Sequence, residues 1–184
     1  SIDTRKASVA RAAVRTGAAL VNDVSMIEDP QMINVISDTD IPIVISHIRK
    51  KGHQGEVVNE VIDDLRGAVS DLRKARVMKS KIIVDPGIGF AKNADESIAL
   101  LRNIHRLRTE LELPVMIGTS RKSFIGSVTD ELVKDRRFGT AATVAWSVAC
   151  EVDIVRVHDV SEMVKVVKMS DILARHFKNG ASRA

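Results

Sequence analysis

Short apolar runs and longer amphipathic stretches alternate along this chain from one end to the other. Runs of branched apolar residues such as Ile82-Ile83-Val84 are typical of buried strands, whereas the stretches between them repeat apolar residues at helical spacing. The pattern predicts strands over 1–2, 20–23, 42–46, 81–84, 114–118 and 153–157, and helices over 6–16, 31–38, 56–76, 95–111, 136–150 and 161–177. This regular alternation favours parallel βαβ units over an antiparallel meander.

Six βα units in tandem predict an α/β fold of the TIM (β/α)8 barrel type. An eight-unit barrel takes about 250 residues, and this chain has 184. We therefore expect about six of the eight units, the C-terminal three quarters of a barrel, with about two N-terminal units absent. Ser1-Ile2-Asp3-Thr4 already resembles the end of a strand, and an open six-stranded sheet would leave its edges bare. Asp29-Pro30 and the 51–55 segment predict loops, and no linker divides residues 1–184, so we expect a single domain.

Composition narrows the range of functions. The 45% hydrophobic content can fill a core, and the net charge of +4 gives a mild preference for anionic ligands. Aromatic residues make up 3% with no Tyr, and the basic clusters at 49–51, 121–122 and 136–137 are small and far apart, so we expect no nucleic-acid binding. The single cysteine, Cys150, excludes an intramolecular disulfide and favours the cytoplasm. No apolar run approaches the roughly 20 residues needed to cross a bilayer, so we expect no membrane association.

The most specific motif, Asp85-Pro86-Gly87-Ile88-Gly89-Phe90, directly follows an apolar run. Pro86 ends the strand and the two glycines permit backbone conformations closed to other residues, which leaves Asp85 at the mouth of the predicted barrel. A carboxylate there can accept two hydrogen bonds from an amino-substituted heterocycle. The alternative is a turn in which Asp85 only caps the next segment.

Hydroxyl groups and two cations follow the predicted strand over 114–118, in Gly118-Thr119-Ser120-Arg121-Lys122-Ser123-Phe124. A helical turn beginning at Ser123 would present backbone N–H groups to a carboxylate or phosphate, and Lys122 could reach a ring atom or an oxyanion of a substrate. The segment is not a P-loop, because the required Gly-x-x-x-x-Gly-Lys-Ser/Thr spacing is absent. A solvated basic loop is the alternative.

Arg156 and His158 alternate with Val155 and Val157, so both point to one face of a strand, which in a barrel is the interior. An inward Arg needs an anion. That anion is either a ligand, such as a diphosphate or a carboxylate, or an internal carboxylate such as Asp85.

Histidine spacing does not predict a zinc site. His47 and His53 are six positions apart with no cysteine nearby, and the remaining histidines lie in different units. His47 and Arg49 follow the predicted strand over 42–46, although a lone His there is more often structural. Any Mg²⁺ would be held largely by a diphosphate substrate.

Taken in order, these motifs resemble the dihydropteroate synthases of the pterin-binding TIM-barrel superfamily. The resemblance runs over nearly the whole chain and includes Ser1-Ile2-Asp3-Thr4, Val21-Asn22-Asp23-Val24, Ser46-His47, Ala91-Lys92, Gly139-Thr140-Ala141-Ala142 and Arg156-Val157-His158-Asp159-Val160. It implies condensation of p-aminobenzoate with 6-hydroxymethyl-7,8-dihydropterin diphosphate, which yields 7,8-dihydropteroate and diphosphate for folate biosynthesis.

The resemblance also implies roles for individual residues. By that likeness the catalytic residues are Lys122, Asp85 and Arg156. The pterin would lie against Asp3, Asn22, Asp85, Gly118 and Lys122, the diphosphate against Asn22, Arg156 and His158, and p-aminobenzoate against Phe90, Lys122 and Ser123. The family further implies Mg²⁺ as cofactor, bound through the diphosphate rather than by ligands of this chain, and a homodimer.

Two features depart from the family pattern. Family members carry two loops ahead of the Ser-Ile-Asp-Thr strand, an asparagine loop for Mg²⁺ and diphosphate and a loop that closes over p-aminobenzoate, and neither is found here. Ser46 stands where the family often has Met, a change expected to loosen one wall of the pterin pocket. Two other functions stay open: the pterin-binding domain of a corrinoid-dependent methyltransferase, which has no use for the 120–123 motif, and an inactive fragment or structural subunit.

Overall fold

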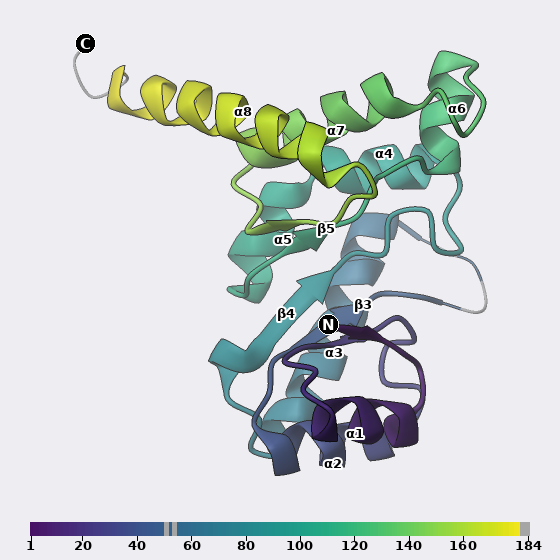
Figure 1. Cartoon of the computed structure of the whole chain (residues 1–184), viewed down its shortest axis with the longest axis vertical. Helices are drawn as coiled ribbons and strands as arrows, with labels where there is room; N and C mark the ends of the chain where they lie inside the picture. The colour runs from purple at the N-terminus through teal and green to yellow at the C-terminus, as the bar shows by residue number, and fades with distance from the viewer. Residues whose placement is uncertain (50–51, 53–54, 181–184) are drawn as a thin grey trace.

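Parallel strands alternate with helices through the computed structural model, which describes residues 1–49, 52 and 55–180, with side chains as far as residue 174 (Figure 1). The strands are β1 (Ile2–Asp3), β2 (Val21–Asp23), β3 (Ile43–Ser46), β4 (Ile82–Asp85), β5 (Met116–Ile117) and β6 (Ile154–Val155). The first four form one parallel sheet in the order β1-β2-β3-β4, and β5 pairs in parallel with β6. A parallel bridge between Val84 and Val115 joins the two sheets, so strands that are neighbours in sequence are neighbours in space.

One helix or two helices follow each strand. They are α1 (Ala7–Arg15), α2 (Gln31–Thr39), α3 (Val57–Lys74), α4 (Ala94–Arg102), α5 (Ile104–Leu111), α6 (Ser123–Thr129), α7 (Arg137–Ala149) and α8 (Val160–Gly180), with a 3-10 turn at Lys79–Lys81 before β4. In Figure 1, α1 and α2 lie below the strands, and α8 packs along α7 at the opposite end. The predicted α/β fold with parallel strands is confirmed.

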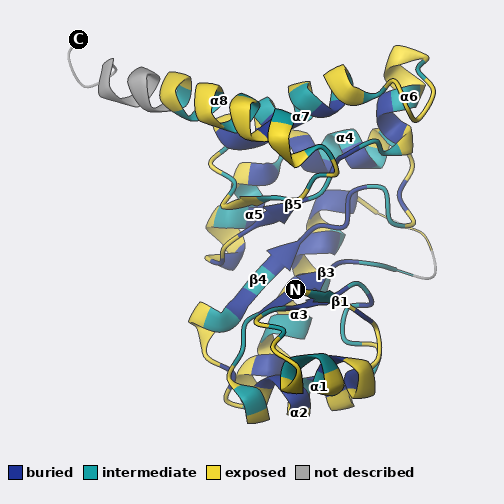
Figure 2. Ribbon diagram, viewed as in Figure 1, coloured by how far each residue is buried: buried dark blue, intermediate teal, exposed yellow. Residues whose placement is uncertain are grey.

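The central strands are buried because helices and neighbouring strands cover them. Ile43, Val44 and Ile45 of β3 are fully buried, as are Ile82 and Val84 of β4. Continuous apolar runs of this kind are typical of parallel sheets covered on both faces. Figure 2 shows the contrast between these dark strands and the exposed outer face of α8. The buried strands give the polar residues at their carboxyl ends a rigid support.

The helix predicted over 95–111 is in fact two helices, α4 and α5, that meet at Asn103. The backbone N–H of Asn103 donates to the Leu100 carbonyl (3.1 Å), and its side-chain amide donates to the Ala99 carbonyl (2.9 Å). Asparagine side chains that bond to the local backbone compete with the helical ladder. The apolar periodicity therefore continues through a point at which the helix ends.

The strand order ends at β1 and β6, and no strand pairing joins these two among the described residues. β6 is shorter than the strand predicted over 153–157, and its Ile154 is 36% exposed. Residues 51, 53 and 54 of the predicted loop, together with Lys50 of the basic cluster, lie outside the described residues.

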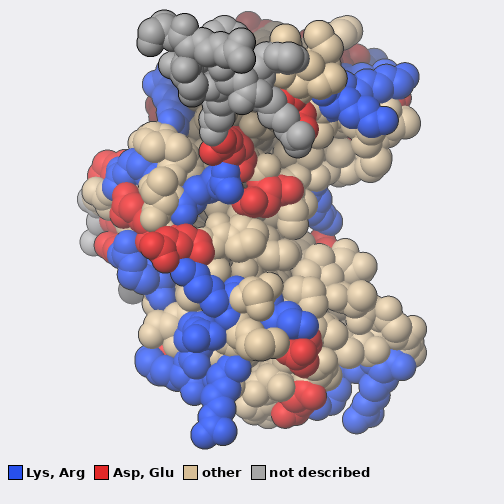
Figure 3. Space-filling view, turned by 90° about the vertical axis from the view of Figure 1, so that its left-hand side faces the viewer, with Lys and Arg blue, Asp and Glu red and all other residues tan. Residues whose placement is uncertain are grey.

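Charged side chains of both signs are interspersed on the molecular face of Figure 3. Surface ion pairs include Arg106–Glu110 (2.9 Å) and Arg108–Asp153 (3.4 Å). Across the described residues, no helix combines the length and the apolar character needed to cross a membrane.

Candidate active site

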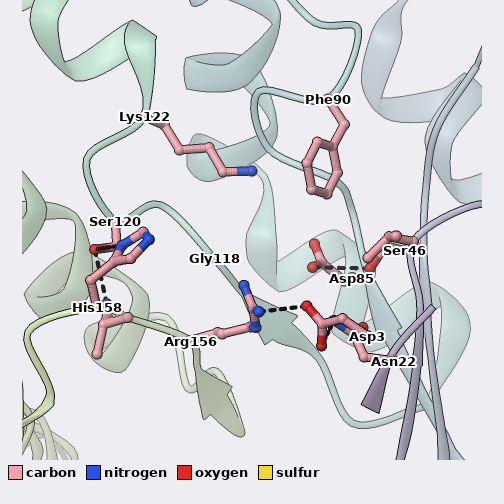
Figure 4. Close-up of a pocket in the computed structure, with 12 residues that line it drawn as sticks. Asp3, Asn22, Ser46, Asp85, Phe90, Gly118, Ser120, Lys122, Arg156 and His158 are labelled. Atoms are coloured by element: carbon pink, nitrogen blue, oxygen red, sulfur yellow. Dashed lines mark hydrogen bonds and ion pairs between the residues drawn. The ribbon is translucent and has the colours of Figure 1, made fainter. Parts of the chain in front are cut away.

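The carboxyl ends of all six strands, with the loops that follow them, surround one cavity of about 320 Å³ (Figure 4). Strand ends of a parallel sheet meet at one edge, so residues far apart in sequence share this cavity. Its volume suits a small organic ligand. The lining residues are Asp3, Asn22, Val24, Ser46, Asp85, Phe90, Gly118, Ser120, Lys122, Arg156, Val157 and His158.

Asp85, the last residue of β4, is a buried carboxylate that faces this cavity. One of its oxygens accepts the Gly87 backbone N–H (2.7 Å), and the other accepts the Ser46 hydroxyl (3.4 Å). Burial raises the pKa of Asp85, although the Gly87 N–H and the charge of Lys122 oppose the shift. No basic side chain of the described residues forms an ion pair with it. The carboxylate therefore keeps lone pairs available for N–H donors of a ligand.

Lys122 forms the opposite wall of the cavity, at the residue before α6. Its ammonium lies 3.8 Å from the centroid of the Phe90 ring and donates to the Ile88 carbonyl. Burial lowers the pKa of Lys122, and the nearby carboxylate of Asp85 opposes that shift. A Cβ at Gly89, which has φ +73°, would lie 2.8 Å from Lys122 Cδ, so this approach needs a glycine. A cation and an aromatic ring thus stand side by side above the cavity.

Arg156 follows β6 and forms an ion pair with Asp3 at the end of β1 (2.5 Å). The sequence left open an internal partner for Arg156, with Asp85 as the example; the partner is Asp3 instead. Asp3 also accepts a hydrogen bond from the Asn22 amide nitrogen (3.1 Å). The buried Asn22 Oδ1 has no hydrogen-bond partner among the described residues. Most buried polar atoms have a hydrogen-bond partner, so this one is an exception beside the cavity.

His158 is held by the loop after β5. Ser120 Oγ accepts the His158 backbone N–H (3.2 Å) and lies 2.8 Å from His158 Nδ1. The neighbouring pair adds a second connection, because Arg121 donates two hydrogen bonds to Asp159 (2.6 and 3.2 Å). Ser120 and Arg121 of the loop after β5 thus orient His158 and Asp159 of the loop after β6.

Ser123 and His47 lie apart from this arrangement. Ser123 is the exposed first residue of α6 and is not among the cavity's lining residues. His47 is fully buried behind the cavity, where its Nε2 lies 3.1 Å from Asp64. His47 therefore has the structural surroundings that a lone histidine usually has, whereas Ser123 requires the ligand to reach past Lys122.

A metal site is not formed by the described residues alone. They contain no group of three or more His, Cys, Asp or Glu side chains that could hold a metal ion. Asp3, a carboxylate on the cavity wall, is occupied by Arg156 and Asn22. These residues do not by themselves fit Mg²⁺, which takes near-octahedral oxygen coordination.

Comparison with known proteins identifies the family. A family model described as "Pterin binding enzyme" matches residues 1–158. The chain belongs to the pterin binding enzyme family.

Individual members of the pterin binding enzyme family resemble the chain over most of its length. Dihydropteroate synthase of Bacillus subtilis is 39% identical over 174 residues, covering 94% of this chain and 61% of that protein. The crystal structure of Clostridium difficile FolP (dihydropteroate synthase) in the presence of pteroic acid superposes with a TM-score of 0.90 at 36% identity, covering 94% of this chain and 66% of that one. Xanthomonas albilineans dihydropteroate synthase with 4-aminobenzoic acid superposes with a TM-score of 0.89 at 34% identity, covering 93% and 63%. The chain therefore spans about three fifths to two thirds of the length of these relatives.

The cavity also has lining residues that sequence reasoning did not assign. Ser120 was visible as a hydroxyl beside two cations, but its bond to His158 was not. Val24 is held by a loop in which the buried Asp23 carboxylate accepts hydrogen bonds from Ser25 and from the Ile27 N–H. An Asp followed two residues later by Ser is a signal for such a loop.

Proposed function

We propose that this chain carries most of the active site of a dihydropteroate synthase, which condenses p-aminobenzoate with 6-hydroxymethyl-7,8-dihydropterin diphosphate. The observation that carries the proposal is the buried Asp85, which has no ion-pair partner among the described residues and lies across the cavity from Lys122. A relative solved in the presence of pteroic acid and another solved with 4-aminobenzoic acid support a pterin and p-aminobenzoate as ligands of this chain.

The pterin would bind in the part of the cavity that Asp85 and Asn22 line. Asp85 accepts two N–H groups of the amino-substituted ring, and Asn22, which also lines the cavity, lies beside it. Asp3 and Gly118 complete the walls, and Lys122 donates to a ring nitrogen or oxygen. Bidentate recognition of this kind fixes both the position and the orientation of a flat ring.

The diphosphate would bind at Arg156 and His158, with Asn22 beside it. In the reaction, the bond between the pterin's exocyclic carbon and the diphosphate oxygen breaks, and the pterin ring spreads the positive charge left on that carbon. A guanidinium beside the leaving group neutralises the charge that develops on it. The chain's residues therefore need only orient the two reactants and stabilise the departing anion.

The p-aminobenzoate ring would lie beside Phe90 and Lys122, with its carboxylate reaching Ser123 at the N-terminal end of α6. Its amine nitrogen then forms the new C–N bond and loses a proton to solvent. In this arrangement Lys122 borders both substrates, Asp85 binds the pterin and Arg156 binds the leaving diphosphate. We therefore infer that Lys122, Asp85 and Arg156 are the catalytic residues.

The finer architecture belongs to the same proposal. We infer that residues 1–184 form one pterin-binding domain and supply about six of the eight units of a TIM barrel, with the others ahead of residue 1. Mg²⁺ would be bound through the diphosphate and a loop in those units. A homodimer is supported by exposed apolar side chains such as Phe138 (82%) and Ile172 (56%), and the cytoplasm by the lone Cys150.

The test is a synthase assay on the chain extended at its N-terminus by the segment that the relatives carry outside the match. With both substrates and Mg²⁺, we expect dihydropteroate by mass spectrometry and an equal amount of diphosphate. Asp85→Asn should lose both products, whereas Arg11→Ala, which removes a surface ion pair with Asp38, should keep them. Transfer of a methyl group to cobalamin in place of condensation would identify the corrinoid alternative and overturn the proposal.

A further inference from the structure

Lys92 is a buried lysine behind the cavity, with 8% of its surface exposed. Its ammonium lies within hydrogen-bond distance of four acceptors: His47 Nδ1 (2.9 Å) and the carbonyls of Gly87 (3.2 Å), Phe90 (3.2 Å) and His47 (3.4 Å). None of these acceptors is a carboxylate, so within the part of the chain that the structure describes no ion pair explains its burial. Lysine is almost never buried without a specific reason.

The acceptors identify what Lys92 holds. Gly87 and Phe90 are the first and last residues of a tight turn, closed by a hydrogen bond from the Phe90 N–H to the Gly87 carbonyl (2.9 Å). Lys92 therefore binds both ends of the turn. Of the two residues between them, Ile88 has a carbonyl that accepts Lys122 instead.

The two glycines of the turn show the same division. A Cβ at Gly87 (φ +67°) would lie 1.9 Å from the His47 carbonyl oxygen and 3.3 Å from Lys92 Nζ. A Cβ at Gly89 would instead meet Lys122. The absence of a side chain at Gly87 lets Lys92 approach the turn, and the absence of one at Gly89 lets Lys122 approach it. The turn is thus clamped between Lys92 on one side and Lys122 on the other.

His47 anchors the buried side of the clamp. An ammonium can only donate, so His47 Nδ1 accepts from Lys92 and Nε2 carries the proton that faces Asp64 (3.1 Å). Asp64 is held in turn by Arg49 (2.8 Å). The chain of contacts connects the turn to α3, which packs against α4 and α5.

We propose that Lys92 is a positioning residue, which holds the 87–90 turn so that Asp85 and Phe90 keep their places in the cavity. The inference rests on the proposed function for its effect on substrates, but the contacts that carry it lie outside the cavity. Gly87 donates to Asp85, Phe90 lines the cavity, and Ile88 receives Lys122. Release of the turn would disturb all three at once.

The charge of Lys92 supports this role and offers a readout. Burial lowers the pKa of Lys92 to about 8. Around it lie the carboxylates of Asp85, Glu96 and Asp64, the ammonium of Lys122 and the ring of His47. Deprotonation removes one of the three donor hydrogens, so the turn should respond as this lysine titrates.

The first experiment measures amide hydrogen exchange in the 184-residue chain. In Lys92→Met, the Phe90 amide should exchange at least about tenfold faster, because its turn has lost the ammonium. Amides in α4 and α7 report whether the variant is folded. Lys74→Met removes an exposed ammonium paired with Asp71 and should leave the Phe90 amide unchanged. Unchanged exchange at Phe90 in folded Lys92→Met overturns the proposal.

A second measurement needs no substitution at Lys92. The ¹³C shifts of the Gly87 and Phe90 carbonyls should titrate together with Lys92 Nζ in the wild type, and should still do so in Lys122→Met, which lacks the other lysine. The ¹³C shifts of the His47 ring are followed in the same titration, so that any effect of His47 on the carbonyl shifts can be subtracted. Carbonyl shifts that stay flat while Lys92 titrates overturn the proposal, even where Lys92→Met does not fold.

The third measurement is pteroic acid binding by calorimetry. We expect Lys92→Met to bind about tenfold more weakly, or about 1.4 kcal/mol, and Lys74→Met to bind as the wild type does. Wild-type protein that binds no pteroic acid would contradict the proposed function, while the exchange and carbonyl data would still test the turn. A loosened turn with unchanged affinity would show that Lys92 does not position the site.

Discussion

Asp85 combines two properties that oppose each other, burial and charge. The residue is 6% exposed, and its carboxylate accepts only Gly87 and Ser46 in the described structure. A group whose charged form is disfavoured by burial is a common signature of a functional site. Burial of the ionised carboxylate makes the fold less stable, and hydrogen bonds from a ligand would offset that unfavourable free energy.

Asp85→Asn should therefore bind a pterin more weakly and fold more stably. The amide replaces one of the two acceptor oxygens with an NH₂ donor, so the affinity for pteroic acid should fall by about 1.5–3 kcal/mol. Because the pKa of Asp85 is raised in the folded state, its ionised form destabilises the fold above the ordinary carboxyl pKa. Urea unfolding at pH 7 should thus give a higher free energy for the variant, a gain that disappears in acid. Unchanged affinity for pteroic acid would show that Asp85 only stabilises the turn that follows it.

Arg156→Ala tests whether the guanidinium serves an anion. We expect diphosphate to bind more weakly by about 1.5–3 kcal/mol, the range for a hydrogen bond to a charged group, and pteroic acid to bind almost as before. Calorimetry with each ligand checks this, with Arg11→Ala as the surface control. Equal losses for both ligands would mean that Arg156 acts mainly by holding Asp3.

Lys92 should give the wild type a stability that rises with pH. Its pKa falls from the ordinary 10.5 to about 8 on folding, so the unfolded chain binds the proton more tightly between these values. Relative to Lys92→Met, the free energy of unfolding of the wild type should rise by about 3 kcal/mol across that interval. Urea unfolding of both proteins at a series of pH values measures the difference. A difference that stays constant with pH contradicts the burial of this charge.

Sequence reasoning placed polar side chains at strand ends but did not determine their partners. Arg156 was expected to face inward, yet nothing in the spacing distinguishes Asp3 from Asp85 as its partner, because that choice depends on how the strands curve. The exposure of Ser123 depends in the same way on the angle at which α6 leaves β5. In the sequence, Lys92 was visible only as part of the Ala91-Lys92 motif. Its contacts with the 87–90 turn depend on the tertiary fold.

Helix α4 begins with a capping box. The Asn93 side chain accepts the Glu96 N–H (2.9 Å), and the Glu96 carboxylate accepts the Asn93 N–H (2.7 Å). This reciprocal pair satisfies two donors that a helix start would otherwise leave unpaired. The cap directly follows Lys92, so it also ends the segment that carries the 87–90 turn.

Asn93→Ala should destabilise the protein by about 1 kcal/mol, or about 2–4 °C in melting temperature for a chain of this size. Thermal unfolding followed by circular dichroism measures the effect. Lys6→Ala is the matched control, because Lys6 begins α1 without a side-chain cap hydrogen bond. Equal effects of the two substitutions would show that the cap contributes nothing.

Element positions followed from the sequence more readily than element ends. The alternation of apolar runs and amphipathic stretches predicted the order of strands and helices except for α6, which was expected only as a helical turn beginning at Ser123. It did not reveal the break at Asn103, because the side-chain bond that ends α4 leaves the apolar spacing intact. Strand lengths were overestimated for β5 and β6, since apolar character extends beyond the residues that pair.

Seen as a whole, the molecule has two edge strands, β1 and β6, beside apolar surface. A groove of about 270 Å³ lies along β6 and α8, lined by Val155, Arg156, Val157, Val160, Met163, Val164 and Val167. Bare strand edges with adjacent apolar side chains favour self-association. The relatives have additional chain that this sequence lacks, and we propose that two βα units cover this groove.

The 184-residue chain should therefore self-associate, and the N-terminally extended protein should be monodisperse and active with Mg²⁺. Light scattering and diphosphate release on both proteins measure the two properties. A short chain that is monomeric and fully active would contradict both the count of barrel units and the position of the absent loops.

The ion pair between Asp3 and Arg156 joins residues 153 positions apart in the sequence. Closing a flexible loop of that length costs about 4–5 kcal/mol in entropy, whereas an ion pair between side chains that are 40% and 58% exposed contributes about 0–1 kcal/mol. The pair therefore cannot hold β1 and β6 in place; the pairing and packing of the strands between them does that. Arg156 can consequently leave Asp3 for an incoming anion, and the exchange leaves the folding equilibrium almost untouched.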